Sequence, residues 1–244
     1  MKTLALICFA AGTLVSVEAL GAVGVYFPPE AVIVRDGNSS LAGPFNTSTS
    51  SRLQQVYAHD AFPDPGFPAA FLIHGIYFRV DENAGAFDET FPSVQVTLST
   101  TSRGPDGLST LFSENIGPDQ TTVFGPGPLH LSGAGSGFPV GFMFERTYLY
   151  DPSAGNLLVD IRNFGPGNAS VLDAFNVLGD SVSIVGNEEV NSPTGSRLTR
   201  GLATMFWVDI VPIPEPGAGA LLLLGLLAVG WNWRRSRRAS ICKG

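Results

Sequence analysis

Short apolar segments, separated by proline and glycine, dominate residues 20–211 and restrict the fold more than any other feature of the sequence. Residues 93–100 alternate polar and apolar side chains, so Val94, Val96 and Leu98 would share one face of a strand. Further strands are predicted from their β-branched and aromatic residues at 32–34, 53–57, 71–80, 142–150, 157–164, 181–185 and 202–210. Short strands with such turns predict an all-β protein, an antiparallel β-sandwich that resembles a jelly roll.

Two local predictions refine this picture of the body. Residues 151–156 have turn chemistry, so the strands at 142–150 and 157–164 are expected to form a hairpin. The apolar positions within 170–178 fit helical spacing and make this segment the one helix candidate of the body. Because no internal linker or repeat is evident, a single extracytoplasmic domain is expected over 20–211.

The two ends of the chain differ from this β-rich body. Residues 1–19 place a lysine before an apolar run and small residues, which is typical of a secretory signal peptide cleaved after Ala19, with Ala22 as a second cleavage point. Residues 218–233 are uncharged and rich in leucine, which predicts a single, rather short transmembrane helix. A basic cluster follows this helix and is expected on the cytoplasmic side, formed by Arg234, Arg235, Arg237 and Arg238.

A proline-containing tripeptide, Pro214, Glu215 and Pro216, stands just before the predicted helix. The order of tripeptide, short apolar helix and arginine cluster, over residues 212–240, resembles the PEP-CTERM sorting signal of exported Gram-negative proteins. The resemblance implies that an exosortase, an integral-membrane cysteine protease, recognises the tripeptide and cuts near it. Before this cleavage the precursor would be held briefly in the inner membrane. After it the mature form would reach the cell surface or be secreted. Simple tail anchoring without cleavage is the alternative.

The body also resembles uncharacterised ectodomains that precede this sorting signal, at residues 52–57, 98–101 and 150–158. This resemblance supports a β-sandwich and implies no activity. Residues 20–212 contain eight arginines, no lysine and 19 acidic residues, so their net charge is −11. A charge of this sign argues against nucleic acid as a partner. Both cysteines, Cys8 and Cys242, lie in the terminal segments, so no disulfide is expected in the body.

Residue patterns that carry catalysis are missing from the sequence. His59, His74 and His130 have no second histidine or cysteine at zinc-ligand spacing, and no Gly-x-Ser-x-Gly elbow or phosphate-binding loop occurs. We therefore expect a surface or extracellular-matrix protein with a structural or adhesive function and no catalytic activity. The alternative is a secreted carbohydrate-binding or carbohydrate-active protein. Carboxylate pairs that could cleave glycosidic bonds can be drawn from the 19 acidic residues, but a sandwich of this charge offers such pairs by chance, so they do not by themselves indicate a hydrolase.

Two segments are candidates for ligand binding. Residues 81–89 gather oxygen-bearing side chains around a glycine, and calcium prefers such ligands, here Asp81, Asn83, Asp88 and Glu89. A structural calcium ion could replace disulfides there, whereas a solvated acidic loop is the simpler interpretation; no other cofactor is expected. Extracellular polysaccharide is a candidate partner, because the segments 52–57 and 156–163 mix polar groups with aromatic or apolar ones. Strand aromatics, however, more often belong to a core.

Overall fold

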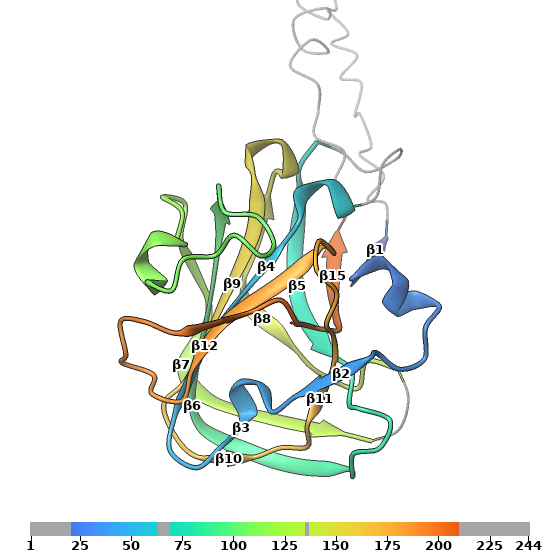
Figure 1. Ribbon diagram of the computed structural model, residues 1–244, viewed down its shortest axis with the longest axis vertical. Coiled ribbons are helices and arrows are strands. Elements are labelled where there is room, and N and C mark those ends of the chain that lie inside the picture. The colour runs from blue at the N-terminus through green and yellow to red at the C-terminus, as the bar shows by residue number, and fades with distance from the viewer. Residues whose placement is uncertain (1–20, 63–68, 135–136, 210–244) are drawn as a thin grey trace, which may run out of the picture. The chain divides into compact units, whose positions relative to one another are not determined.

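The computed structural model describes residues 21–62, 69–134 and 137–209, and these form two facing antiparallel sheets (Figure 1). The four-stranded sheet has the order β1 (Ala22–Phe27), β15 (Thr204–Asp209), β5 (Phe71–Phe78) and β8 (Val140–Tyr150). The six-stranded sheet has the order β13 (Ser196–Leu198), β12 (Val182–Asn187), β4 (Ser51–Tyr57), β9 (Asn156–Asn163), β6 (Phe87–Thr101) and β7 (Thr121–Gly133). Every pairing within the two sheets is antiparallel.

The path of the chain between the sheets is that of a jelly roll. From β4 to β9 the chain changes sheet at every step except the β6–β7 hairpin. The result is the order β1-β15-β5-β8 facing β4-β9-β6-β7, with β12 and β13 added beside β4. The prediction of an all-β antiparallel sandwich is therefore confirmed. The signal peptide and the C-terminal helix were predicted for segments outside the described residues. Within the described ranges, no helix has the length and apolar character needed to cross a bilayer.

Smaller elements complete the domain. A three-stranded sheet has the order β14 (Gly201–Leu202), β11 (Leu172–Phe175) and β2 (Ser39–Leu41), and β10 (Gly167–Asn168) pairs with β3 (Asn46–Thr47). The described helices are single 3-10 turns: η1 (Pro29–Val32), η2 (Gly43–Phe45), η3 (His59–Ala61), η4 (Phe112–Glu114) and η5 (Pro152–Ala154).

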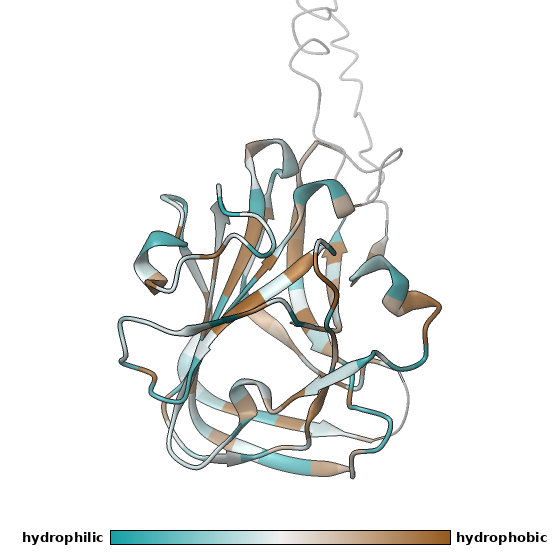
Figure 2. Ribbon diagram, in the orientation of Figure 1, coloured by the Kyte–Doolittle hydropathy of each residue, from teal (hydrophilic) through white to brown (hydrophobic). Residues whose placement is uncertain are grey.

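The core lies between the two sheets. Val94, Val96 and Leu98 are fully buried in it, as their alternation along β6 predicts. Aromatic rings from both sheets meet there edge to face, with Tyr57 of β4 packing 4.8 Å from Phe206 of β15 between ring centroids. Figure 2 shows apolar residues along the central strands of the sandwich. The absence of cysteine from the body is thus matched by a large apolar and aromatic core.

The predicted hairpin between residues 142–150 and 157–164 is wrong. β8 pairs with β5, whereas β9 pairs with β4 and β6 in the opposite sheet. The turn chemistry itself is present, since the Asp151 carboxylate accepts a hydrogen bond of 2.8 Å from the Ser153 amide at η5. A turn of this kind reverses the chain but does not determine which sheet the next strand joins. Here it carries the chain across the sandwich.

Three further segments differ from their predicted conformation. Residues 170–178 do not form a helix, because Leu172–Phe175 is a strand buried on both sides, so its apolar residues do not alternate. Residues 32–34 are not a strand, since η1 ends at Val32, and Ile33 is 85% exposed. The predicted strand at 202–210 is divided between β14 and β15.

Candidate functional site

The polar residues of β4 do not form a ligand-binding face, and this interpretation of residues 52–57 is wrong. All residues of β4 are buried. Gln55 donates a hydrogen bond of 3.0 Å to the carbonyl of Leu202, and the Tyr57 hydroxyl lies 3.0 Å from the Thr204 hydroxyl. Burial raises the pKa of Tyr57, so its phenol stays neutral. Residues 156–163 on β9 are mostly buried as well.

Both faces of the six-stranded sheet are covered around β4 and β9, which explains this burial. The core covers the inner face, and the connection between β6 and β7 covers the outer face with an apolar cluster. That second cluster consists of Val56, Leu108, Phe112, Leu158 and Val185, with Ile116 packed against it. Sequence periodicity cannot distinguish a face that is covered by a loop from a face that is open to solvent.

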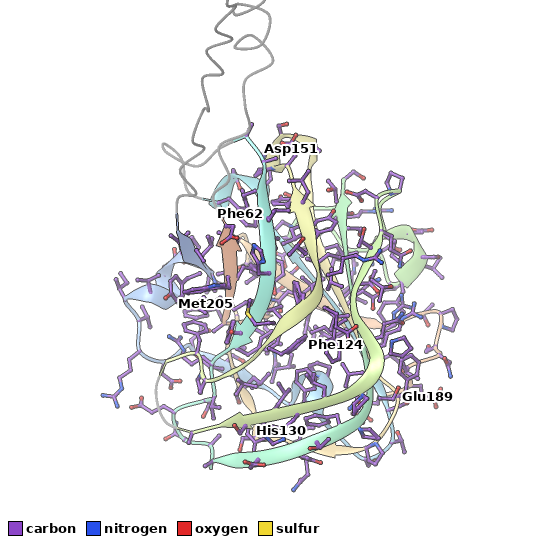
Figure 3. All side chains as sticks on the ribbon, turned by 180° about the vertical axis from the view of Figure 1, so that it is seen from behind. Phe62, Phe124, His130, Asp151, Glu189 and Met205 are labelled. Atoms are coloured by element: carbon purple, nitrogen blue, oxygen red, sulfur yellow. The ribbon has the colours of Figure 1, made fainter. Side chains whose placement is uncertain are left out.

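The outer face of the four-stranded sheet, by contrast, carries aromatic and sulfur-containing side chains at the surface. Cross-strand pairing aligns Tyr26, Met205 and Tyr77 in one row over β1, β15 and β5. Trp207 occupies the next row and is 36% exposed. Met143 of β8 extends the row of Trp207 and is 49% exposed. Figure 3 views the protein from the side of this sheet, with Met205 labelled. We call these five residues, with the glycines between them, the aromatic face.

Three glycines make the aromatic face flat. Gly24 and Gly75 flank Trp207 on the neighbouring strands, and Gly141 follows Tyr77 in its row. A Cβ atom at Gly141 would lie 2.1 Å from Cδ1 of Tyr77, so this ring occupies the space where a side chain would stand. An isolated glycine in a strand marks such a close approach, so the sequence signals close packing at each of these strands but not which strands pair to form the face.

A polar pair borders the aromatic face. A bulge in β5 between Ile73 and Gly75 displaces His74, and its Nε2 atom lies 2.8 Å from Oδ2 of Asp209 on β15. The two side chains are 22% and 39% exposed, and the Nε2 atom of His74 itself is buried. His74 therefore lies at the rim of the sheet. The arrangement offers ring faces beside hydrogen-bonding groups.

The residues predicted to bind calcium are not brought together as a set. Asp88 lies 3.8 Å from the His130 ring on β7, and Glu89 accepts a hydrogen bond of 2.8 Å from the Asn168 amide. Asp81 instead lies with Asp36 and Asp173, and carboxylate oxygens of these three residues are within 4.8 Å of one another. Asn83 is tied to Asp81 only through its backbone amide, at 3.0 Å. Sequence reasoning missed Asp36 and Asp173 because they are distant in the chain.

The electrostatics around Asp173 are those of a buried ion pair. Its carboxylate contacts the Arg79 guanidinium, with a distance of 2.5 Å between Nε and Oδ2, and accepts a hydrogen bond from the Gly37 amide. Burial raises the pKa of Asp173, and the neighbouring Asp36 carboxylate raises it further, against the lowering effect of Arg79. One arginine thus partly compensates the three carboxylates.

A second acidic group lies where residues 102–108 meet residues 179–182. The Gly179 amide donates a hydrogen bond of 3.0 Å to Asp106, and the Val182 amide donates one of 2.9 Å to Asp180. Burial, followed by the charges of Asp106 and Glu30, raises the pKa of Asp180 to about 6.

Comparison with known proteins identifies the C-terminal segment of the chain. Residues 212–238 match the family model of the PEP-CTERM protein-sorting motif. The curated proteins contain no significant match to this chain. The predicted sorting signal is therefore confirmed, and it indicates an exported protein that an exosortase sorts through a membrane-anchored precursor. The matched range includes the tripeptide Pro214, Glu215 and Pro216 and the arginine cluster; these residues, like Ala19, lie outside the described part of the chain.

Proposed function

We propose that the jelly-roll domain is the cargo of this sorting route and serves at the cell surface or in the extracellular matrix as an adhesive or structural component without catalytic activity. The observation that carries the proposal is the sorting motif at 212–238 on the same chain as the jelly-roll domain. Matrix polysaccharide is the proposed partner of the mature protein. The inner membrane and the exosortase are partners of the precursor only.

Charge supports an extracellular function. The net charge of −11 over residues 20–212 favours solubility and disfavours binding to nucleic acid or other polyanions. A jelly roll by itself does not identify a function, because this fold hosts many unrelated ones.

The alternative is a secreted carbohydrate-active enzyme. Glycoside hydrolysis requires two carboxyl groups about 5–9.5 Å apart on either side of the scissile bond. The aromatic face and its border, as described above, include one carboxylate, Asp209, which is paired with His74. A binding function is therefore favoured over hydrolysis at this face. Release of reducing sugar from neutral polysaccharides by the purified protein would establish the alternative.

Mass spectrometry of the protein recovered from its native cells tests the sorting proposal. We expect mature material that begins after Ala19 and ends near Pro214–Pro216, and accumulation of the longer precursor when the exosortase gene is deleted. Glu215→Ala should also accumulate precursor. Glu189→Ala, which removes a carboxylate from the body of the protein instead, should be processed normally. Surface material that retains an intact Arg234–Arg238 segment would instead establish simple tail anchoring.

A further inference from the structure

We propose that the aromatic face binds a neutral polysaccharide chain, with sugar rings stacking on Trp207 and Tyr77. This inference rests on the proposed function, because it assigns the matrix partner to a specific surface. Sugar rings present apolar C–H groups on their faces and hydroxyl groups around their edges. A complementary surface therefore needs flat aromatic rings surrounded by hydrogen-bonding groups.

The glycines of the aromatic face provide the flat rings. The Tyr77 ring lies over Gly141, because a Cβ there would be 2.1 and 2.4 Å from Cδ1 and Cγ of the tyrosine. Tyr26 also folds back toward its neighbouring glycine, with its hydroxyl oxygen and Cε2 atom 3.2 and 3.3 Å from the Cβ position of Gly24, but Phe138 packs edge to face against its ring at 5.3 Å between centroids. The Tyr77 ring, which lies against the sheet, has one side covered and can present the other to a ligand.

The pairing of the strands places the rings at intervals that suit a polymer. Tyr26 and Tyr77 lie in one row on the two sides of β15, and Trp207 stands in the next row on β15 itself. Diagonal neighbours in a sheet are separated by about 7–8 Å, so successive units of one polysaccharide chain can contact different rings. A surface of this kind suits an extended chain better than a single small sugar.

Hydrogen-bonding groups lie between and beside the rings. The Tyr77 hydroxyl donates to the Met143 sulfur at 3.4 Å, and because a thioether is a weak acceptor, this bond is readily exchanged for one to a sugar hydroxyl. His74 and Asp209 lie at the border, where Asp209, 39% exposed, can accept a hydrogen bond from a sugar hydroxyl beside its contact with His74. The aromatic face thus combines stacking surface with polar groups that can orient the sugar.

The net charge of the protein determines which ligands the aromatic face can bind. The five side chains of the aromatic face are uncharged, whereas residues 20–212 carry a net charge of −11. This excess of negative charge repels anionic polysaccharides and anionic membranes, and it also opposes pairing of two copies of the protein. A neutral polysaccharide avoids each of these costs.

Affinity electrophoresis of the full chain in non-ionic detergent tests the inference. Native gels are cast with neutral polymers, namely hydroxyethylcellulose, laminarin, dextran and galactomannan, or with the anionic polymer alginate. We expect retardation by at least one neutral polymer and none by alginate. Trp207→Ala and Tyr77→Ala should each weaken the retardation about fivefold to tenfold, the effect of losing one stacking contact. Trp207→Phe should retain most of it.

Phe164→Ala is the matched control, because Phe164 is 39% exposed, close to the 36% of Trp207, and lies outside the aromatic face. It should bind like the wild type, and circular dichroism should show that all variants are folded. Retardation by none of the neutral polymers, retardation by alginate alone, or equal loss in Phe164→Ala would overturn the inference. Concentration-dependent dimers that Trp207→Ala abolishes would also overturn it and identify a protein interface. Processing is measured separately, so normal processing without binding would refute this inference and leave the sorting proposal intact.

Discussion

The guanidinium group of Arg52 on β4 donates two hydrogen bonds, of 2.6 Å and 3.1 Å, to the carboxylate of Asp160 on β9. Both side chains are almost completely buried, at 8% and 4% exposure. The Arg52 guanidinium also stacks 4.3 Å above the Phe112 ring, which comes from the connection between β6 and β7. Gln54 joins the group by donating to Asp160 at 2.9 Å and accepting from Asn115 at 2.9 Å. This network fixes the connection that covers the six-stranded sheet.

Removal of Asp160 should therefore destabilise the protein severely. Asp160→Ala leaves the Arg52 charge buried without its partner, and breaking a buried pair in this way costs about 3–5 kcal/mol. Urea denaturation followed by circular dichroism should show this loss in the free energy of unfolding.

The exposed ion pair between Arg103 and Glu114 provides the control for this prediction. Their side chains are 42% and 48% exposed and lie 3.3 Å apart. Glu114→Ala should cost less than about 1 kcal/mol, because solvent screens exposed pairs. Equal losses of unfolding free energy in Asp160→Ala and Glu114→Ala would show that burial does not make the Arg52–Asp160 pair more important than an exposed pair.

Asp180 should make the stability of the domain depend on pH. Its pKa is raised from 3.8 to about 6, so the folded protein binds this proton more tightly than the unfolded chain does. The ionised carboxylate therefore lowers stability increasingly as pH rises from about 4 through about 6, and fully above that. Asp180→Asn removes the charge but keeps an acceptor for the Val182 amide. The variant should be more stable than the wild type at neutral pH, and this advantage should vanish near pH 4. A constant advantage across that range would exclude Asp180 as the titrating group.

The strands that sequence patterns predicted well are those with a clear environment on each face. The alternation within 93–100 identified part of β6, and the aromatic and β-branched run at 71–80 identified β5. β7 was missed because Pro126, Pro128 and several glycines weaken its strand signal. Proline is tolerated there because β7 is the edge strand of its sheet and needs partners on one side only.

The candidate site was less predictable than the fold. Tyr26, Tyr77 and Trp207 are far apart in the sequence, and only the pairing of β1, β15 and β5 brings them to one surface. The aromatic and polar residues of 52–57 carried an equally good local signal, yet a loop and the opposite sheet bury them. Local patterns determine which face of a strand is apolar. They do not determine what covers that face.

Calcium binding remains a prediction, and its sharpest test is at Asp81, the one residue that belongs both to the predicted set and to the cluster with Asp36 and Asp173. An ion there would offset the repulsion among three carboxylates and stabilise the folded state. Millimolar calcium should raise the melting temperature relative to a chelator, and Asp81→Asn should abolish the increase. Asp88→Asn is the matched control, since Asp88 lies apart from the cluster, beside His130. An unchanged melting temperature in calcium would exclude a stabilising calcium ion at this cluster.

Gly141 should not tolerate a side chain, because the Tyr77 ring occupies the space where its Cβ atom would stand. Gly141→Ala would place a Cβ atom 2.1 Å from this ring and 2.7 Å from the Ile76 carbonyl oxygen, so the ring must lift from the sheet. Overpacking of this kind costs about 1–3 kcal/mol, which urea denaturation can measure. At Gly127 on β7 an added Cβ meets no atom within 4 Å, so Gly127→Ala should have little effect. If Gly141→Ala is as stable as Gly127→Ala and leaves the retardation by neutral polysaccharide unchanged, the flat position of Tyr77 is not what makes this face bind.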